Sequence, residues 1–155
     1  MAQLMDPGNQ DFQIFAGTVR HALDAKNRVT IPSRWRHDGT DEFYAIGDPR
    51  KPVVLLFLPE ELRRMHHKIE ALTDIPESQK RSITRQLFAQ ASPCPIDKQG
   101  RLVLPKPLCD QFDLKGEVVL VGGGTRIELR RPDEWEETCD IDRDPFIKGA
   151  HSLGL

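Results

Sequence analysis

Two stretches of the chain place an aspartate and an arginine four residues apart in the same setting. One reads LDAKNRVTIP from Leu23, and the other reads IDKQGRLVLP from Ile96. In each, an apolar residue is followed by Asp, three residues, Arg, three apolar or β-branched residues and Pro. A carboxylate and a guanidinium at this spacing can form a charge-assisted hydrogen bond across a turn and hold the guanidinium in a fixed direction.

The residue directly before each arginine also predicts a turn. Asn27 in the first stretch and Gly100 in the second are the two residue types that most readily adopt positive φ. We expect a short strand on either side of each turn, so that each stretch forms a hairpin. Pro32 and Pro105 then end the second strand, and a single helical turn can begin in SRWR or KPLC.

Positive charge is concentrated around the first stretch, although the whole chain has a formal net charge of -2. Between residues 20 and 36 a single acidic residue, Asp24, accompanies the basic residues Arg20, Lys26, Arg28, Arg34 and Arg36. The second stretch is less basic, because Cys109 stands where the first has Arg36. The basic residues there are Lys98, Arg101 and Lys106.

Basic side chains on a β-hairpin can contact phosphates, and the major groove of DNA admits a two-stranded ribbon. The basic residues of both stretches, together with Asn27, are therefore our candidate DNA-binding residues. Asp24, Asp97 and Gly100 are the candidates for holding them in position. The residues leave a second interpretation open, in which Arg28 and Arg101 only pair with Asp24 and Asp97 to stabilise the turns.

The two stretches belong to a longer internal repeat. Sliding the chain against itself by 73 residues aligns Phe15 with Phe88, Asp24 with Asp97, Arg28 with Arg101, Pro32 with Pro105 and Pro59 with Pro132. Each repeat then continues with two apolar strand candidates, residues 42–46 with 53–58 and residues 117–121 with 126–130. The first repeat is followed by helix candidates at residues 59–72 and 76–91. We interpret this as a tandem duplication.

Neither repeat is large enough to bury a core alone, so we expect the two to interlock. The predicted fold is α+β, with both repeats joined about a pseudo-two-fold axis into one β-barrel-like core flanked by helices. The predicted organisation is a flexible N-terminal extension (1–12), a first repeat with its helix (13–72), a linking helix (73–92), a second repeat (86–138) and a flexible tail (139–155).

Other chemistry has weaker support. His66 and His67 are adjacent on a helix, where side chains point about 100° apart, and the H-E-x-x-H spacing is missing. The glycines of GGGTR, from Gly122, fall between two strands and predict a hairpin loop rather than a phosphate-binding loop. Three widely spaced cysteines without a C-x-x-C pair indicate neither a disulfide framework nor a zinc site. We therefore expect no enzyme activity, catalytic residue, metal, cofactor or small-molecule substrate.

No segment has the composition of a signal peptide, and the longest apolar run, VVLLFL, is too short to span a bilayer. We therefore expect a cytoplasmic protein without membrane contact.

The tandem stretches DAKNRVTIPSRWR and DKQGRLVLP resemble the MraZ family, whose members carry a D-x-x-x-R motif once in each of two SpoVT/AbrB-like, swapped-hairpin units. The similarity runs from Phe15 to about Trp135, with Asn27 where such motifs usually have Gly. The resemblance implies a sequence-specific DNA-binding transcriptional regulator of the division and cell-wall gene cluster. Such a protein binds short direct repeats of double-stranded DNA near its own promoter as a ring-shaped homo-oligomer, and it associates with the nucleoid.

Two other functions stay open. An AbrB-like module can act as a protein-interaction or antitoxin-type domain that touches DNA only incidentally. A small hydrolase that uses the His66 and His67 region is the third and weakest hypothesis.

Overall fold

Antiparallel strands form the centre of the protein in this computed structural model, which describes residues 13–36 and 39–155. The strands are β1 (Thr18–Leu23), β2 (Arg28–Thr30), β3 (Glu42–Gly47), β4 (Val54–Phe57), β5 (Ser92–Pro95), β6 (Arg101–Val103), β7 (Gly116–Gly122) and β8 (Ile127–Arg130). The helices are α1 (Pro59–Glu70), α2 (Glu77–Gln90), α3 (Lys106–Gln111) and α4 (Pro132–Ala150), with the short 3-10 helices η1 (Ser33–Trp35) and η2 (His151–Leu153). The α+β class predicted from the sequence is confirmed. The predicted extension, residues 1–12, lies outside the described residues.

The internal repeat is visible in these elements. At the offset of 73 residues, β2 matches β6 and β4 matches β8 residue for residue, and α1 and α4 both begin at the matching prolines, Pro59 and Pro132. β1 corresponds to β5, β3 to β7, and η1 to α3. Among the described elements, α2 has no counterpart in the second repeat.

Strands from the two repeats pair with each other in both sheets. The six-stranded sheet has the order β1-β7-β8-β4-β3-β5, in which β1 pairs with β7 and β4 with β8 across the repeats. β2 and β6 form a separate two-stranded sheet, with Val29 opposite Leu102. Each repeat therefore supplies strands that complete the sheets of the other.

The prediction that β1 and β2 form a hairpin is wrong in one respect. The chain does reverse at the turn, but the two strands that flank it enter different sheets. Because β2 pairs with β6, the central residues of both short strands are buried, Val29 to 1% and Leu102 to 0% exposure. All six residues of β1 instead pair with residues of the long strand β7.

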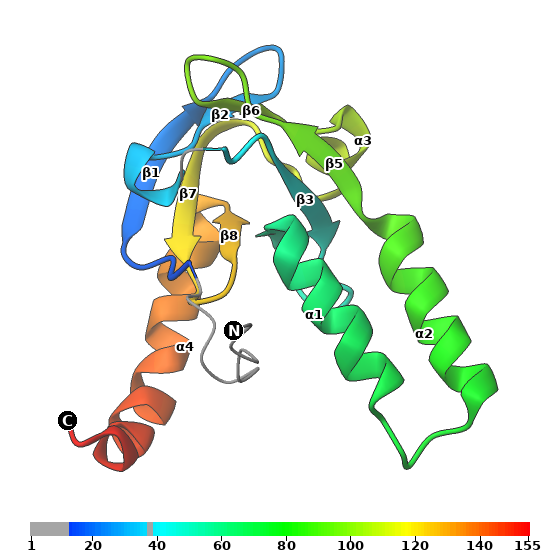
Figure 1. Cartoon of the computed structure of the whole chain (residues 1–155). Helices are drawn as coiled ribbons and strands as arrows, with labels where there is room; N and C mark the ends of the chain where they lie inside the picture. Colours follow the sequence, from blue (N-terminus) through cyan, green and yellow to red (C-terminus); the bar gives the residue numbers. More distant parts are fainter. Residues whose placement is uncertain (1–12, 37–38) are drawn as a thin grey trace, which may run out of the picture.

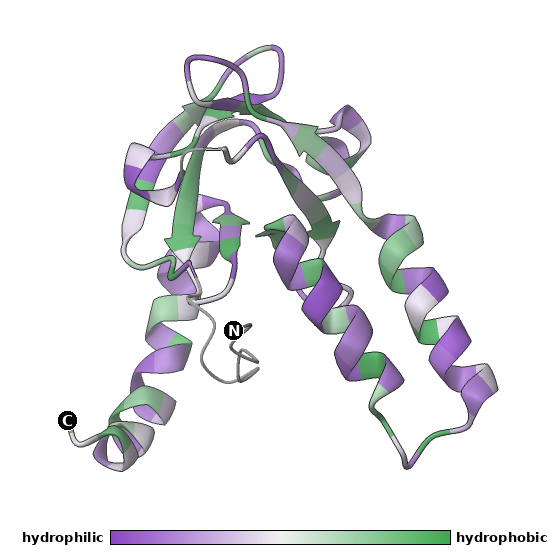
Figure 2. Ribbon diagram, in the orientation of Figure 1, coloured by the Kyte–Doolittle hydropathy of each residue, from purple (hydrophilic) through white to green (hydrophobic). Residues whose placement is uncertain are grey.

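The core lies on both sides of β4, which explains its continuous apolar sequence. Val54 and Leu56 face the main core, whereas Leu55 and Phe57 face a second cluster with Leu62 of α1. Successive side chains of a strand point to opposite faces, so a strand covered on both sides is apolar throughout. The mixture of apolar strands and polar helix surfaces is visible in Figure 2.

The C-terminal segment differs from the sequence-based expectation. Residues 139–150, expected to be a tail without regular structure, continue α4. The expectation rested on the lack of apolar periodicity, but backbone hydrogen bonds four residues apart form a helix without a buried face. The start of α4 is fastened to the sheet, because the nearly buried Arg130 of β8 forms an ion pair with Glu134 of α4 (2.5 Å) as well as with its strand neighbour Glu128 (2.8 Å).

Within the described residues, none of the helices combines the length and the apolar character that crossing a membrane requires.

Candidate nucleic-acid interface

The first turn is organised by the carboxylate of Asp24. Its Oδ1 accepts hydrogen bonds from the backbone N–H groups of Lys26 and Arg28, both at 2.9 Å. Its Oδ2 accepts a hydrogen bond from Nε of the Arg28 guanidinium at 2.7 Å. Asn27 adopts φ of 59°, so the predicted left-handed turn and Asp–Arg pair are both present.

The second turn repeats this arrangement. Asp97 Oδ1 accepts from the backbone N–H groups of Gln99 (3.0 Å) and Arg101 (2.9 Å), and Oδ2 accepts from Arg101 Nε at 2.8 Å. Gly100 takes φ of 81° at the position of Asn27. In addition, Arg101 Nη2 donates to Gln99 Oε1 at 3.4 Å, a contact that the first turn lacks the acceptor for, because Lys26 stands at the position of Gln99.

These hydrogen bonds lower the pKa of both carboxyl groups. For Asp24 the largest cause is the backbone N–H of Arg28, and for Asp97 it is the backbone N–H of Arg101; in both turns the arginine side chain lowers the pKa further. Both carboxylates are therefore ionised at neutral pH. Because only Nε of each arginine bonds to the carboxylate, the outer nitrogens of the guanidinium are directed away from the aspartate.

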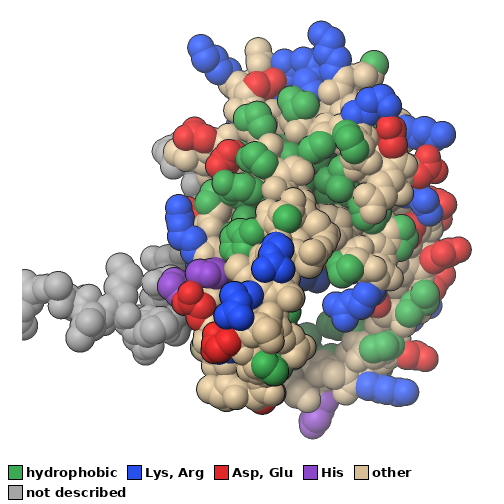
Figure 3. Space-filling model, turned by 90° about the vertical axis from the view of Figure 1, so that its right-hand side faces the viewer, with side chains coloured by type: hydrophobic (Ala, Val, Ile, Leu, Met, Phe, Trp, Pro, Cys, Tyr) green, Lys and Arg blue, Asp and Glu red, His purple; other side chains and the backbone are tan. Residues whose placement is uncertain are grey.

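The pairing of β2 with β6 brings the two turns together. The Ile31 N–H donates to the carbonyl of Gly100 at 2.9 Å, and the Leu104 N–H donates to the carbonyl of Asn27 at 2.8 Å. These two bonds occupy equivalent positions of the repeats, so the turns are joined reciprocally. The two loops lie side by side at the top of Figure 1, and basic side chains project at the same end in Figure 3. We call residues 24–28 and 97–101 together the paired-turn surface.

Arg36 belongs to the second turn in space, although it follows the first in sequence. Its Nε donates to the carbonyl of Ile31 at 3.0 Å, and its guanidinium lies directly against Gly100. A Cβ added to Gly100 would lie 2.5 Å from Arg36 Cζ, so the glycine makes room for the guanidinium. This contact is not among those predicted from the sequence. Two differences between the repeats could have indicated it: Arg36 stands where the second repeat has the smaller Cys109, and Gly100 stands where the first repeat has Asn27. The long side chain of one repeat thus lies against the residue without a side chain in the other.

Three of the other candidate residues have different surroundings. Arg20 forms ion pairs with Glu117 (3.0 Å) and Glu136 (3.4 Å). Lys106 pairs with Asp110 at 2.7 Å, and this carboxylate raises the pKa of the lysine. The Arg34 guanidinium lies over the Trp35 ring and close to Gly17, which precedes β1 at the end far from the turn. Lys26 and Lys98, in contrast, are exposed within the turns.

The alternative sites of the sequence analysis have ordinary structural positions. His66 lies 3.4 Å from Glu70 and packs edge-on against Phe88. The glycines from Gly122 form the loop between β7 and β8, as predicted. In the described part of the chain, no group of three or more His, Cys, Asp or Glu residues is arranged to hold a metal ion. Burial raises the pKa of the Cys94 thiol to about 11.

Comparison with known proteins connects this geometry to a family. Residues 87–153 match the family model described as "MraZ protein, putative antitoxin-like". Over 142 residues the chain is 34% identical to the transcriptional regulator MraZ of Pediococcus pentosaceus, covering 90% of this chain and 96% of that protein. It is 35% identical to the MraZ of Carboxydothermus hydrogenoformans over 127 residues (82% and 87% of the two chains). It is 30% identical to that of Clostridium tetani over 144 residues (92% and 100%).

The fold and the site define a class of small α+β proteins in which two repeats each present an Asp–Arg turn. The three relatives to which the chain is similar are named transcriptional regulators. The chain belongs to the MraZ family.

Proposed function

We propose that this protein is a sequence-specific DNA-binding transcriptional regulator whose paired-turn surface contacts duplex DNA. The observation that carries the proposal is the reciprocal joining of two nearly identical turns. In each, an ionised aspartate holds an arginine by Nε and does not occupy its outer nitrogens, of which Arg101 Nη2 also donates to Gln99 Oε1. Arginine fixed in this way suits bidentate contacts with phosphates or with guanine in the major groove.

Within this surface the basic residues have different parts. Lys26 and Lys98 are exposed at the tips and contact phosphates, whereas Arg28 and Arg101 are fixed in direction and contact base edges. Arg36 adds a third guanidinium beside Gly100. Arg20 and Lys106 contribute less, because each is already neutralised by a carboxylate, and Arg34 lies toward the other end of β1.

The two repeats are, in this proposal, SpoVT/AbrB-like units of swapped-hairpin type that interlock as a pseudo-two-fold barrel. The exchange of strands between the repeats in both sheets supports this. Several copies assemble into a ring, so that successive paired-turn surfaces bind short direct repeats near the promoter of the protein's own gene, in the division and cell-wall cluster. Linked contacts raise the affinity of individually weak ones. The same binding associates the protein with the nucleoid in the cytoplasm.

A gel-shift assay with the DNA upstream of the protein's own gene tests the proposal. Lys26→Ala and Lys98→Ala should each weaken binding without changing the melting temperature, because both side chains are exposed. Arg34→Ala is the matched control and should bind as the wild type does. Folded wild-type protein that gives no shift at low salt would refute DNA binding.

A second candidate, an interaction module of the antitoxin type, is favoured by the description of the matching family model. In that function the paired-turn surface binds an acidic protein surface instead of DNA. The same gel shift separates the two functions, because an interaction module gives no sequence-dependent shift.

A further inference from the structure

The two turns of the paired-turn surface share a backbone conformation but differ at one central position. Asn27 and Gly100 both adopt positive φ, of 59° and 81°. Their carbonyls accept the hydrogen bonds, from the N–H groups of Leu104 and Ile31, that join the two turns. Both residues therefore lie where the turns meet, and one of them carries a carboxamide where the other has no side chain.

The place beside Gly100 is filled from the other repeat. A Cβ added to Gly100 would lie 2.5 Å from Cζ of Arg36, so the guanidinium takes the space into which a side chain would extend. At the first turn the residue that matches Arg36 is Cys109, which is 3% exposed and too short to cover the turn in the same way. The carboxamide of Asn27 therefore corresponds in position to the guanidinium of Arg36.

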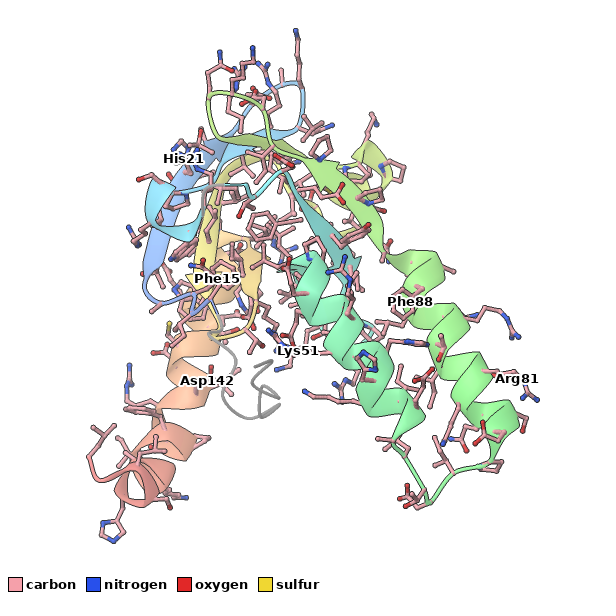
Figure 4. The ribbon with its side chains drawn as sticks, viewed as in Figure 1. Phe15, His21, Lys51, Arg81, Phe88 and Asp142 are labelled. Carbon is pink, nitrogen blue, oxygen red and sulfur yellow. The ribbon has the colours of Figure 1, made fainter. Side chains whose placement is uncertain are left out.

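The carboxamide of Asn27 is available to a ligand. The residue is partly exposed, and its side chain forms no hydrogen bond with the described residues. The amide of the second turn, Gln99, is instead engaged, because its Oε1 accepts from Arg101 Nη2. Figure 4 shows the side chains of both loops projecting at the top of the molecule, at the opposite end from Arg81 and Asp142 on the helices. The helices of the chain therefore leave this surface open.

A carboxamide and a guanidinium recognise different bases. The carboxamide presents a hydrogen-bond donor and an acceptor side by side, whereas the guanidinium presents donors alone. In the major groove adenine offers an acceptor, N7, beside a donor, N6, and guanine offers two acceptors, N7 and O6. Asn27 therefore matches adenine, whereas Arg36 matches guanine or a phosphate. The two turns differ in what they can bind at this position, although their Asp–Arg pairs are the same.

We propose that Asn27 is a specificity-determining residue that binds the major-groove edge of an adenine, with Nδ2 donating to N7 and Oδ1 accepting from N6. This inference rests on the proposed function, because it requires the paired-turn surface to enter the major groove. Neighbouring Cα atoms are about 3.8 Å apart and neighbouring base pairs about 3.4 Å, so the adenine lies next to the base pair that Arg28 contacts. Because Arg36 stands at the corresponding place of the second turn, the surface binds its DNA element in one orientation.

Replacing single atoms of the DNA tests this contact. The probe is the DNA upstream of the protein's own gene, in which each adenine in turn is replaced by 7-deazaadenine, a base that lacks the N7 acceptor but still pairs with thymine. One such replacement should weaken binding of the wild type about five- to tenfold. Asn27→Gly should bind the unmodified DNA about tenfold more weakly, and the same replacement should weaken its binding no further. Replacing a guanine by 7-deazaguanine at an arginine contact should weaken both proteins equally.

The variants are chosen to keep the turn intact. Glycine adopts positive φ readily and stands at this position in the second turn, so Asn27→Gly should unfold cooperatively in a thermal melt as the wild type does. Asn27→Asp, which tolerates the same conformation, loses the donor to N7 and should also be insensitive to 7-deazaadenine. Gln111→Ala removes an exposed amide on α3 and is the matched control, which should bind as the wild type does.

The salt dependence gives a second measurement. Asn27 is uncharged, so Asn27→Gly should leave the slope of log affinity against log salt unchanged. If the sensitive adenine affects Asn27→Gly as strongly as the wild type, or if no adenine is sensitive, the inference is refuted while DNA binding stands. Wild-type protein that gives no shift at low salt refutes DNA binding itself, and the inference with it.

Discussion

Replacing Gly100 with alanine tests the contact between Arg36 and the second turn. Gly100 has φ of 81°, and an added Cβ would lie 2.5 Å from Arg36 Cζ. The left-handed conformation costs an alanine about 1 to 2 kcal/mol. The guanidinium must also move away, which breaks its hydrogen bond to the carbonyl of Ile31, a loss of about 1 kcal/mol. Gly100→Ala should therefore lower the free energy of unfolding by about 2.5 kcal/mol, measured by urea denaturation.

A double-mutant cycle separates the two contributions. Arg36→Ala should cost about 1 kcal/mol alone, but it should cost nothing more when Gly100→Ala is already present, because the same hydrogen bond is lost only once. The control is Gly124→Ala, at φ of 83° with open space around it, which has the conformational cost alone. Its effect should add to that of Arg36→Ala. If Gly100→Ala and Arg36→Ala are also additive within about 0.5 kcal/mol, the guanidinium does not lie on the second turn in solution.

Three further predictions concern buried charge, pH and salt. Arg130→Met should destabilise the protein by about 3 to 5 kcal/mol in thermal unfolding, since Glu128 and Glu134 lose their buried partner. Asp24 has a lowered pKa, so its stabilising effect is fully present above its unfolded pKa of about 4 and is lost as the pH falls through the lower folded value. Acid titration should therefore show the stability difference between wild type and Asp24→Asn start to shrink only below about pH 4 and be gone once the pH lies below the folded value. Arg28→Lys keeps the positive charge but loses the planar guanidinium. The slope of log affinity against log salt should therefore stay the same, while the preference for the promoter DNA over unrelated DNA decreases. A changed slope with an unchanged preference would contradict the role of Arg28 in contacting base edges.

Much of the local structure follows from the sequence. The Asp–Arg pairs, the positive φ of Asn27 and Gly100, and the helix starts at Pro59 and Pro132 were all predictable, because each depends on interactions within about five residues. The repeat was also visible, because the duplicated units keep the same residues at the same turns and helix starts. The fold class followed from the alternation of apolar strand candidates with amphipathic helix candidates.

The arrangement of charge was not predictable in the same way. The sequence groups Arg20, Arg34 and Arg36 in one basic segment, but the structure separates them. Arg20 lies opposite Glu117, Arg34 lies on Trp35, and Arg36 contacts Gly100 of the other repeat. Two of these three contacts join residues more than 60 positions apart, so nothing in the neighbouring sequence indicates them.

The sequence alone therefore determined the two turns, the repeat and the fold class, because local hydrogen bonds and backbone preferences fix them. Only the tertiary structure decided that β2 pairs with β6 instead of β1, that the two turns lie side by side, and that Phe146 and Ile147 of α4 are exposed. These features come from burying apolar side chains of two repeats in one core. Neither repeat can do this separately, and which strands meet depends on how both fit together.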